Sequence, residues 1–370
     1  MEQADSGAAD SVPQGSVRQS GGTENSGTEG SGVAVAGLAD SGVAGSDAEA
    51  ARSRTGRIGR RLLAVRRGDR VLVLLAALVT FLLLFPAAVP NGVGRLGSLL
   101  ETFLPWLGLT APLLAALALL RRSAVALAAA LAPAAAWCAL FGGLLLPPSD
   151  TSSDVTALQH NVSDENPDPS GTAGRLLKAG ADLVALEELT PAALPAFEEA
   201  LQGRYPHHAV TGTVGLWSTY PLDDVRPVDI KPQGVGAGWN RGLRATARTP
   251  HGDVAVYVAH LPSVRIGLSG GFRSAWRDES AALLGAAIAA EPLERVILLG
   301  DLNSTVDDRG LAPVSSQMRL PGSGLAFSWP AAMPVARIDQ ILAREATVTH
   351  VWSLSATGSD HLPIAARIRF

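Results

Sequence analysis

Polar side chains suited to catalysis stand at the ends of short apolar runs in the second half of the chain. They are Asn161 in TALQHNV, Glu188 in DLVALEEL, His260 in VAVYVAHLPS, Asp301 and Asn303 in VILLGDLN, Asp339 in ARIDQIL, and Asp360 and His361 in GSDHLP. A single Asp or Asn at such a place is usually explained by turn chemistry, in which the side chain bonds its own backbone. The whole set is more informative, because it combines carboxylates, carboxamides and two histidines and contains no cysteine.

This combination of side chains favours a hard divalent metal and a phosphate ester. Carboxylate and carboxamide oxygens suit Mg²⁺ or Mn²⁺, which keep several waters for a phosphate substrate. Zinc is disfavoured, because the sequence has no spaced His/Cys cluster such as HExxH. The chemistry we expect is attack of water on phosphorus, in which the metal neutralises phosphate charge and a carboxylate orients or deprotonates the water.

Short strands and helices alternate from residue 150 to residue 370 and predict one α/β domain. The expected strands are 155–162, 183–186, 210–217, 243–248, 254–259, 296–299, 338–343, 348–354 and 364–368. The expected helices are 171–179, 191–201 and about 272–290. Most of the candidate residues therefore lie where strands end.

The segments LQHNV, LVALEEL, GLWSTYPL, YVAHLPS, ILLGDLNST, ARIDQIL and GSDHLPI occur in this order along the chain. In this order they resemble the signature blocks of the endonuclease/exonuclease/phosphatase superfamily, which includes DNase I, abasic-site endonucleases, neutral sphingomyelinases and inositol phosphatases. The resemblance covers residues 156–370. It implies a four-layer α/β/β/α sandwich of the DNase I type and a Mg²⁺-dependent phosphoesterase.

The resemblance also implies a role for each candidate. Glu188 would be the principal metal ligand, with Asp360 near the metal. Asn161 and Asn303 would contact the phosphate, and Asp301 would orient or deprotonate the water. His361 would stabilise the pentacovalent phosphate, Asp339 would hold the His361 ring, and His260 would contact the phosphate or the leaving group. Such donors act by stabilising the charge that develops in the transition state.

Three positions depart from the family pattern. Ser163 stands where abasic-site endonucleases place a second acidic ligand, so metal binding would depend mainly on Glu188. Glu187 stands where Gln is common, and we expect a solvated carboxylate there, with a supporting contact to the metal site as the alternative. Gln340 stands where many family members have His, and we expect this exchange to have no effect on function.

Other polar and aromatic residues have two interpretations each. Arg241, Arg244, Arg273 and Arg277 could bind phosphate, but surface ion pairs explain them at least as well. Trp239, Trp276 and Trp329 could stack on a substrate, and core packing is the simpler explanation for each.

The first half of the chain indicates a membrane protein. Residues 1–50 are rich in Gly, Ser, Ala and acidic residues and contain no aromatic residue, so we expect a disordered tail. Residues 51–70 are basic, and residues 71–149 contain three apolar stretches, at about 71–89, 102–120 and 123–146. We expect three transmembrane helices, because a membrane helix needs roughly 20 such residues. A cleaved signal peptide followed by soluble core helices is the alternative.

Basic residues set the expected orientation. Residues 51–70 and the Arg121-Arg122 pair would stay in the cytoplasm, which places the α/β domain outside after three crossings of the cell membrane. The single cysteine, Cys138, excludes an intrachain disulfide.

The charge of the α/β domain bears on its substrate. Residues 150–370 contain 24 acidic and 18 basic residues, which argues against non-specific nucleic-acid binding through many phosphate contacts. The sequence leaves nucleic acid and phospholipid headgroups both open as substrates, does not separate phosphodiesters from phosphomonoesters, and indicates no protein partner. A catalytically silent domain that binds a partner through the same fold is the contrasting hypothesis.

Overall fold

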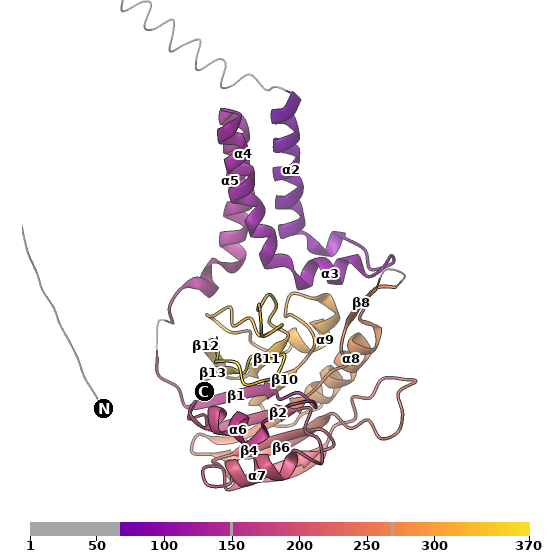
Figure 1. Ribbon diagram of the computed structural model, residues 1–370, viewed down its shortest axis with the longest axis vertical. Coiled ribbons are helices and arrows are strands. Elements are labelled where there is room, and N and C mark those ends of the chain that lie inside the picture. Colours follow the sequence, from indigo (N-terminus) through magenta and orange to yellow (C-terminus); the bar gives the residue numbers. More distant parts are fainter. Residues whose placement is uncertain (1–66, 149–150, 268–269) are drawn as a thin grey trace, which may run out of the picture. The chain divides into compact units, whose positions relative to one another are not determined.

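A computed structural model of the chain describes residues 67–148, 151–267 and 270–370 (Figure 1). The predicted disordered tail, residues 1–50, lies outside the described residues, as does the predicted basic segment up to residue 66. The described residues form a helical region, 67–148, and the α/β domain that follows it.

Within the described residues, the strands form two larger sheets and a short hairpin. The six-stranded sheet has the order β12 (Thr347–Ser353), β13 (Ile364–Arg369), β1 (Val155–Asn161), β2 (Leu183–Glu187), β4 (Val214–Ser218) and β3 (His207–Thr211). The five-stranded sheet has the order β11 (Asp339–Arg344), β10 (Val296–Asp301), β7 (Gly252–Ala259), β6 (Gly242–Thr249) and β5 (Leu222–Pro227). The hairpin pairs β8 (Arg265–Gly267) with β9 (Gly271–Arg273).

One parallel pair lies inside each larger sheet, and the remaining neighbours are antiparallel. The parallel pairs are β1 with β2 and β7 with β10. Because parallel strands end at the same edge of a sheet, the residues that follow these four strands are brought together in pairs. Asn161 lies opposite Glu187 at the end of β1 and β2, and Asp301 pairs with Asp339 of the antiparallel β11.

Apolar side chains between the two sheets form the central core. The cluster combines Val155, Ala185 and Leu216 of the first sheet with Val256 and Ile297 of the second. Helices α6 (Pro169–Leu177) and α7 (Leu194–Leu201) cover the outer face of the first sheet, and α8 (Ala275–Ala289) and α9 (Ala312–Ser315) cover the outer face of the second. The predicted α/β sandwich is therefore confirmed.

Local sequence signals explain several element boundaries. Asp168 caps α6, because its side chain accepts a hydrogen bond from the Gly171 amide at 2.9 Å, and Pro169 occupies the first turn. The expected strand 210–217 was wrong as one element. The chain turns at Gly212, which has a φ of 57°, and forms the β3–β4 hairpin instead.

The helical region contains shorter elements than the three predicted spans. It comprises α2 (Arg67–Leu84), η1 (Pro86–Ala88), α3 (Leu96–Thr102), η2 (Leu104–Leu109), α4 (Thr110–Leu120), α5 (Ala124–Phe141) and η3 (Gly142–Leu145). In Figure 1, α2, α4 and α5 run side by side. Apolar contacts join them, and Ala76, Leu114 and Ala130 are buried between them.

Three transmembrane helices are not supported by the described residues. One helix, Ala124–Leu145, is long and apolar enough to cross a membrane, and a second candidate arises only if Leu96–Thr102 and Leu104–Leu120, which are bent by 71°, count as one span. The helix α2 ends before Pro86 and begins with Arg67, Asp69 and Arg70, which leaves too short an apolar stretch. The second expected span is broken at Phe103 and Pro105.

Candidate active site

The strand ends of both sheets open into one cavity of about 740 Å³. Six of the predicted site residues line it: Asn161, Glu188, Asp301, Asn303, Asp360 and His361. His260 and Asp339 are fully buried beneath the cavity wall. His260 contacts Asp301, and Asp339 contacts His361. The structure thus brings together the eight candidates that the sequence placed at the ends of short apolar runs.

Asp301 is the centre of this group, and it is 1% exposed. Its Oδ1 accepts a hydrogen bond from the Asn303 amide at 2.9 Å, and its Oδ2 accepts one from Asn161 Nδ2 at 3.1 Å. Its Oδ2 also lies 3.6 Å from His260 Nε2 and 3.8 Å from His361 Nε2. Asn303 adopts a left-handed φ of 47° in the short turn after β10, and in this turn its backbone amide points to Asp301 Oδ1.

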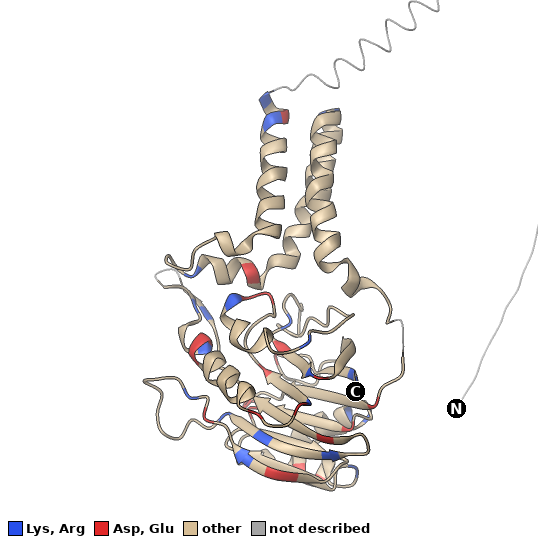
Figure 2. Ribbon diagram, turned by 180° about the vertical axis from the view of Figure 1, so that it is seen from behind, with Lys and Arg blue, Asp and Glu red and all other residues tan. Residues whose placement is uncertain are grey.

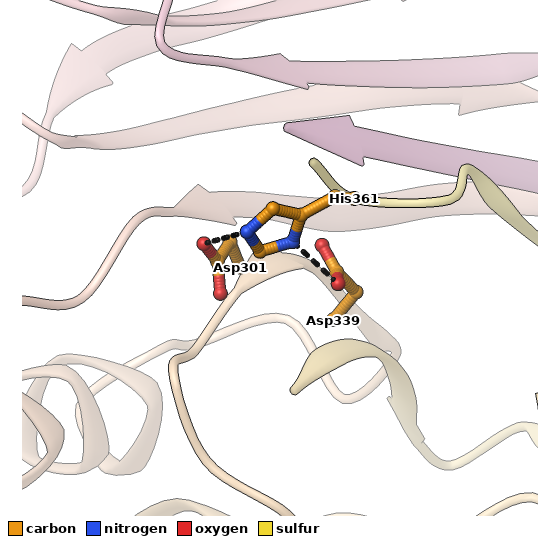
Figure 3. A group of neighbouring side chains, drawn as sticks. All are labelled: Asp301, Asp339 and His361. Atoms are coloured by element: carbon orange, nitrogen blue, oxygen red, sulfur yellow. Dashed lines mark hydrogen bonds and ion pairs between the residues drawn. The ribbon is translucent and has the colours of Figure 1, made fainter. Parts of the chain in front are cut away.

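His361 is held between two carboxylates, as Figure 3 shows. Its Nδ1 lies 2.9 Å from Asp339 Oδ2, and its other ring nitrogen faces Asp301. Gln159 Nε2 donates a hydrogen bond of 2.9 Å to Asp339 Oδ1, which fixes the second oxygen of that carboxylate. The ring orientation is therefore set from β1 and β11 together.

Charges in this buried group shift its proton affinities. Burial by itself lowers the pKa of His361, but the negative charges of Asp339 and Asp301 raise it to about 10. Burial raises the pKa of Asp301 to about 7 despite the nearby His361. Burial would raise the pKa of Asp339 too, but the charge of His361 and its hydrogen bond hold it below its usual value. At neutral pH the site therefore contains a protonated His361 next to a carboxyl group poised to exchange a proton.

His260 has the opposite electrostatic environment. Burial lowers its pKa well below the usual value, and the positive charge of Arg241 lowers it further. Arg241 Nη1 lies 3.3 Å from His260 Nδ1. The imidazole is therefore neutral, and Arg241 is a polar neighbour of the site rather than a member of a surface ion pair.

Glu188 and Asp360 provide the carboxylates expected to bind a metal. The Glu188 side chain is 27% exposed, its Oε1 lies 3.8 Å from His260 Nε2, and its Oε2 accepts a hydrogen bond from the Asp164 amide at 3.2 Å. Asp360 is exposed and lines the same cavity. These hard oxygen donors fit Mg²⁺ or Mn²⁺. The described residues also contain a buried group, Asp301, Asp339 and His361, with ligand atoms close enough to hold a metal ion.

Two residues beside the site were missed or misjudged from sequence. Glu187 is not a solvated carboxylate, because it is fully buried and its Oε2 accepts a hydrogen bond from Gln159 Nε2 at 2.8 Å. Burial and the charges of Asp339 and Asp301 raise its pKa well above the usual value. Gln159 was not predicted at all, although a polar residue inside the apolar strand before Asn161 was a usable signal.

Acidic residues near the metal-binding position were also missed. Ser163 does line the cavity, but so do Asp164 and Glu165, which directly follow it. Two acidic side chains therefore line the cavity directly after the position where abasic-site endonucleases have their second acidic ligand. Their signal was present in the sequence as the run SDEN after Asn161.

Two of the arginines form buried ion pairs rather than surface pairs. Arg277 Nη2 lies 2.6 Å from Asp308 Oδ2, and neither side chain is exposed. Its Nη1 donates a hydrogen bond to the Asn303 carbonyl oxygen at 3.2 Å. Arg244 binds Glu291 on the outer face of the five-stranded sheet. Arg277 therefore supports the turn that carries Asn303, and Arg244 does not contact the site.

Comparisons with known proteins identify the α/β domain. A family model described as "Endonuclease/Exonuclease/phosphatase family" matches residues 158–361, which is more than half of the chain. This range begins in β1 and ends at His361. No curated protein matched the chain.

The solved structures that the chain matches include three from different organisms. Sphingomyelinase C from Streptomyces griseocarneus is 19% identical, with a TM-score of 0.44, and the match covers 59% of this chain and 99% of that one. TDP2 of D. rerio complexed with single strand DNA product is 16% identical, with a TM-score of 0.47, and the match covers 58% and 99%. An endonuclease/exonuclease/phosphatase family protein from Bacteroides thetaiotaomicron is 18% identical, with a TM-score of 0.47 and coverage of 58% and 95%.

Proposed function

Because the chain belongs to the endonuclease/exonuclease/phosphatase family and is a hydrolase acting on phosphoester bonds, we propose that it is a divalent-metal-dependent phosphodiesterase held at a membrane by its N-terminal helices. The observation that carries this proposal is the convergence of Asn161, Asp301, Asn303 and His361 on one cavity. A catalytically silent binding domain would not need to bury a protonated histidine against two carboxylates, since that arrangement costs desolvation energy.

Four residues of the cavity have distinct roles in phosphodiester hydrolysis. Asp301 accepts a proton from the attacking water, and a pKa of about 7 suits that role at neutral pH. The water oxygen bonds to phosphorus, and the bond from phosphorus to the leaving oxygen breaks. The protonated His361 faces the negative charge that develops on the phosphoryl oxygens, and the carboxamides of Asn161 and Asn303 offer further donors to these oxygens.

A metal ion would be held by Glu188, with Asp360 near it. When bound, Mg²⁺ or Mn²⁺ would neutralise phosphate charge and position the substrate. The protein's own part in this step is to keep Glu188 in a left-handed turn with a φ of 59°, directly after β2. Asp164 supports the same carboxylate through its backbone amide at 3.2 Å.

Several features of the helical region support a membrane anchor. The helices α4 and α5 contain no charged residue, and the charged residues of α2 lie at its first turn (Figure 2). Only 28% of the apolar stretch in Ala124–Leu145 is buried inside the protein. Leu74, Leu113 and Leu131 are among the large apolar side chains that remain exposed. An exposed apolar surface of this kind is stable in lipid and unfavourable in water.

Contacts at the two ends of the helical region support the orientation. Arg121 Nε lies 3.3 Å from Asp69 Oδ1, so the start of α2 and the turn before α5 lie together at a basic end. At the other end, the Pro86 carbonyl oxygen accepts a hydrogen bond from Arg309 of the α/β domain at 3.0 Å. A basic end on the cytoplasmic side would place the α/β domain outside the cell membrane.

The catalytic proposal is tested with the full chain in detergent micelles or lipid nanodiscs. We expect Mg²⁺-dependent hydrolysis of the soluble diester bis(p-nitrophenyl) phosphate, and EDTA abolishes it. Asp301→Asn and His361→Ala lose the activity, whereas Asp223→Asn, which changes an exposed carboxylate paired with Arg248, retains it. Activity that survives EDTA, or that both site variants retain, would rule out this mechanism.

The orientation is tested with a cysteine reporter. In a Cys138→Ala background, a cysteine at Thr151 should react with a membrane-impermeant thiol reagent in intact cells, because Thr151 is exposed at the start of the α/β domain. A matched cysteine at Gly68, at the basic end of α2, should react only after the membrane is permeabilised. The reverse pattern would place the α/β domain in the cytoplasm.

A further inference from the structure

Three cavities follow one another from the catalytic residues to the candidate membrane helix. The catalytic cavity shares Thr102 and Ala336 with a second cavity of about 240 Å³. The second shares Pro105, Leu325 and Phe327 with a third cavity of about 350 Å³. These shared wall residues place the three cavities next to one another, in a row from the catalytic residues to α5.

We propose that the helical region forms an acyl-chain subsite, and that the enzyme binds a membrane phospholipid with its phosphate at Asp301 and His361 and its apolar chain in the third cavity. This inference rests on the proposed function, because it assigns the phosphate of the lipid to the catalytic residues. It adds a binding site that the α/β domain could not form by itself, since the helical region supplies one wall of each cavity.

The chemistry of the walls changes along the path. The catalytic cavity is lined by polar and apolar residues together, and Phe103, Ile266, Phe272, Trp329 and Ile338 are among the apolar ones. Of these, Phe103 comes from the junction of α3 and η2 in the helical region. A substrate with a charged phosphate and an adjoining apolar part matches this lining.

The second cavity has a few polar groups within an apolar wall. Arg337 and Asp307 line it, and Thr305 Oγ1 is buried with no hydrogen-bond partner among the described residues. A buried hydroxyl without a partner is unfavourable unless a ligand or a water bonds to it. The ester carbonyls that join the chains of a phospholipid to its backbone lie a few bonds from the phosphorus and can accept such bonds.

The third cavity is apolar and lies against the candidate membrane helix. Its walls are Pro105, Trp106, Gly108, Leu109, Trp137, Leu325 and Phe327, without a charged residue. Both indole N–H groups donate to backbone carbonyls, Trp106 to Val335 and Trp137 to Pro105, each at 2.6 Å. The rings therefore offer the cavity apolar faces, and an acyl chain fits this chemistry better than a nucleotide does.

The membrane is the source that these observations favour. Trp137 belongs to α5, and α5 is part of the helix that is long and apolar enough to cross a membrane. An acyl chain can therefore pass from lipid into the third cavity without crossing water. Nucleic acid is disfavoured as the ligand, because the third cavity has an apolar lining that suits an acyl chain and offers no partner to a charged phosphate backbone.

Competition with a soluble substrate tests the acyl-chain subsite. The full chain in detergent micelles hydrolyses bis(p-nitrophenyl) phosphate, and dioleoylphosphatidylglycerol or a DNA oligonucleotide is added as a competitor. We expect competitive inhibition by the lipid, and weaker inhibition by dibutyrylphosphatidylglycerol, which has the same headgroup. Leu325→Gln should weaken inhibition by the dioleoyl lipid about tenfold, because it places an amide against the apolar chain.

Leu113→Gln is the matched control, because Leu113 is exposed on α4 and lines none of the three cavities. It should leave inhibition by the lipid unchanged. Equal effects of the two variants, equal inhibition by the long-chain and short-chain lipids, or stronger inhibition by the oligonucleotide would overturn the subsite. Failure of the proposed function is distinct, because bis(p-nitrophenyl) phosphate would then not be hydrolysed in the absence of any competitor.

Crosslinking locates the bound chain without requiring turnover. The Asp301→Asn variant in nanodiscs is irradiated with phosphatidylglycerol that carries a diazirine near the end of one acyl chain. We expect adducts at Leu325 or Phe327, which lie in the α/β domain, in addition to adducts on the exposed surface of α5. Adducts confined to the helices would show lipid around the anchor only and would contradict the proposal.

Discussion

Two groups of buried charged side chains in the α/β domain differ in how their carboxylates are satisfied. On the outer face of the five-stranded sheet, both oxygens of Glu291 are bound by Arg244, at 2.9 and 3.0 Å, and Tyr257 donates a further hydrogen bond at 2.8 Å. At the strand ends, Asp301, Asp339 and Glu187 are buried around His361, and no arginine among the described residues binds any of them in this way.

The pKa values record this difference. Burial acts to raise the pKa of Glu291, but its hydrogen bonds from Arg244 and the Leu293 amide lower it to about 2. Burial raises the pKa of Asp301 to about 7. The same removal from water therefore fixes one carboxylate in its ionised form and leaves another ready to bind a proton, depending on the donors around it. Burial of charge alone does not identify a catalytic site, whereas a buried carboxyl group beside a cavity with a pKa of about 7 is a candidate for a catalytic role.

The largest effect expected from this comparison is on activity. Asp301→Asn should reduce kcat/KM for bis(p-nitrophenyl) phosphate by about 10²- to 10⁴-fold, because the amide cannot accept the proton of the water. The stability of the fold should not fall, since the change removes a carboxyl group whose pKa burial has raised. Steady-state kinetics and urea unfolding of the same preparation measure the two effects. A loss of activity that only follows unfolding would contradict the assignment.

The second prediction concerns the buried ion pair between Arg244 and Glu291. Arg244→Met should lower the free energy of unfolding by about 3–5 kcal/mol, because it removes the arginine that binds both oxygens of the buried Glu291 and leaves only Arg226, 3.8 Å away, as a positive charge beside it. The value of kcat/KM per folded molecule should be unchanged, since neither residue lines the catalytic cavity. Urea unfolding of the full chain in detergent, together with kinetics below the transition, provides the measurement.

Arg248→Met is the matched control for the buried pair. Arg248 makes ion pairs with Asp223 and Asp253 on the surface, and its side chain is 49% exposed. Its replacement should cost less than about 1 kcal/mol. The double variant Arg244→Met with Glu291→Met should recover most of the stability lost in Arg244→Met. Equal losses for Arg244→Met and Arg248→Met would remove the distinction between the two kinds of pair.

The position of the site was predictable from sequence because it follows from strand ends. Asn161 and Asp301 stand where an apolar run stops, at the ends of strands that each have a parallel neighbour. His361 instead stands just before β13, which runs antiparallel to β1 and therefore begins at the edge where β1 ends. The spacing of apolar residues contains this information. The burial of Glu187 and Gln159 next to the site was not predictable in the same way. It depends on which strands lie on either side of β1 and β2.

The errors in the fold have equally local causes. The run 210–217 is apolar on both sides of Gly212 and Thr213, so periodicity alone did not separate β3 from β4. The strand β5 was missed, because Asp223, Asp224 and Arg226 make it polar and largely exposed. In the helical region, composition indicated apolar stretches, but the bend of 71° after Thr102 depends on how the chain meets the α/β domain, where Glu101 binds Arg309.

The third prediction concerns how the free energy of unfolding depends on pH through Glu291 of the buried ion pair. The pKa of Glu291 is about 2 in the folded protein, below its ordinary value of 4.5. A carboxyl group with a lowered pKa contributes stability above its unfolded pKa, and that contribution is lost as the pH falls from about 4.5 towards about 2. The free energy of unfolding of the wild type should therefore fall more steeply over this window than that of the Arg244→Met and Glu291→Met double variant. Parallel curves for the two proteins would contradict the assignment.

The smallest effect is expected from Glu187→Gln, within the catalytic group. Glu187 is fully buried, its Oε1 has no hydrogen-bond partner among the described residues, and its pKa is raised well above the usual value by burial and by Asp339. Burial and the nearby carboxylates therefore favour the neutral form of this carboxyl group, and an amide of the same shape can still accept the hydrogen bond from Gln159. We expect kcat/KM to change only a few-fold, in contrast to Asp301→Asn.

Gln159→Met is the control that separates shape from hydrogen bonding at Glu187. It removes the Nε2 donor that Gln159 offers to both Glu187, at 2.8 Å, and Asp339, at 2.9 Å. Because Asp339 orients the His361 ring, the activity should fall by about tenfold or more. If Glu187→Gln instead reduced kcat/KM as much as Asp301→Asn does, Glu187 would be ionised in the working enzyme. The contrast between the two buried groups would then lie in which carboxylates reach the substrate, and not in which of them are protonated.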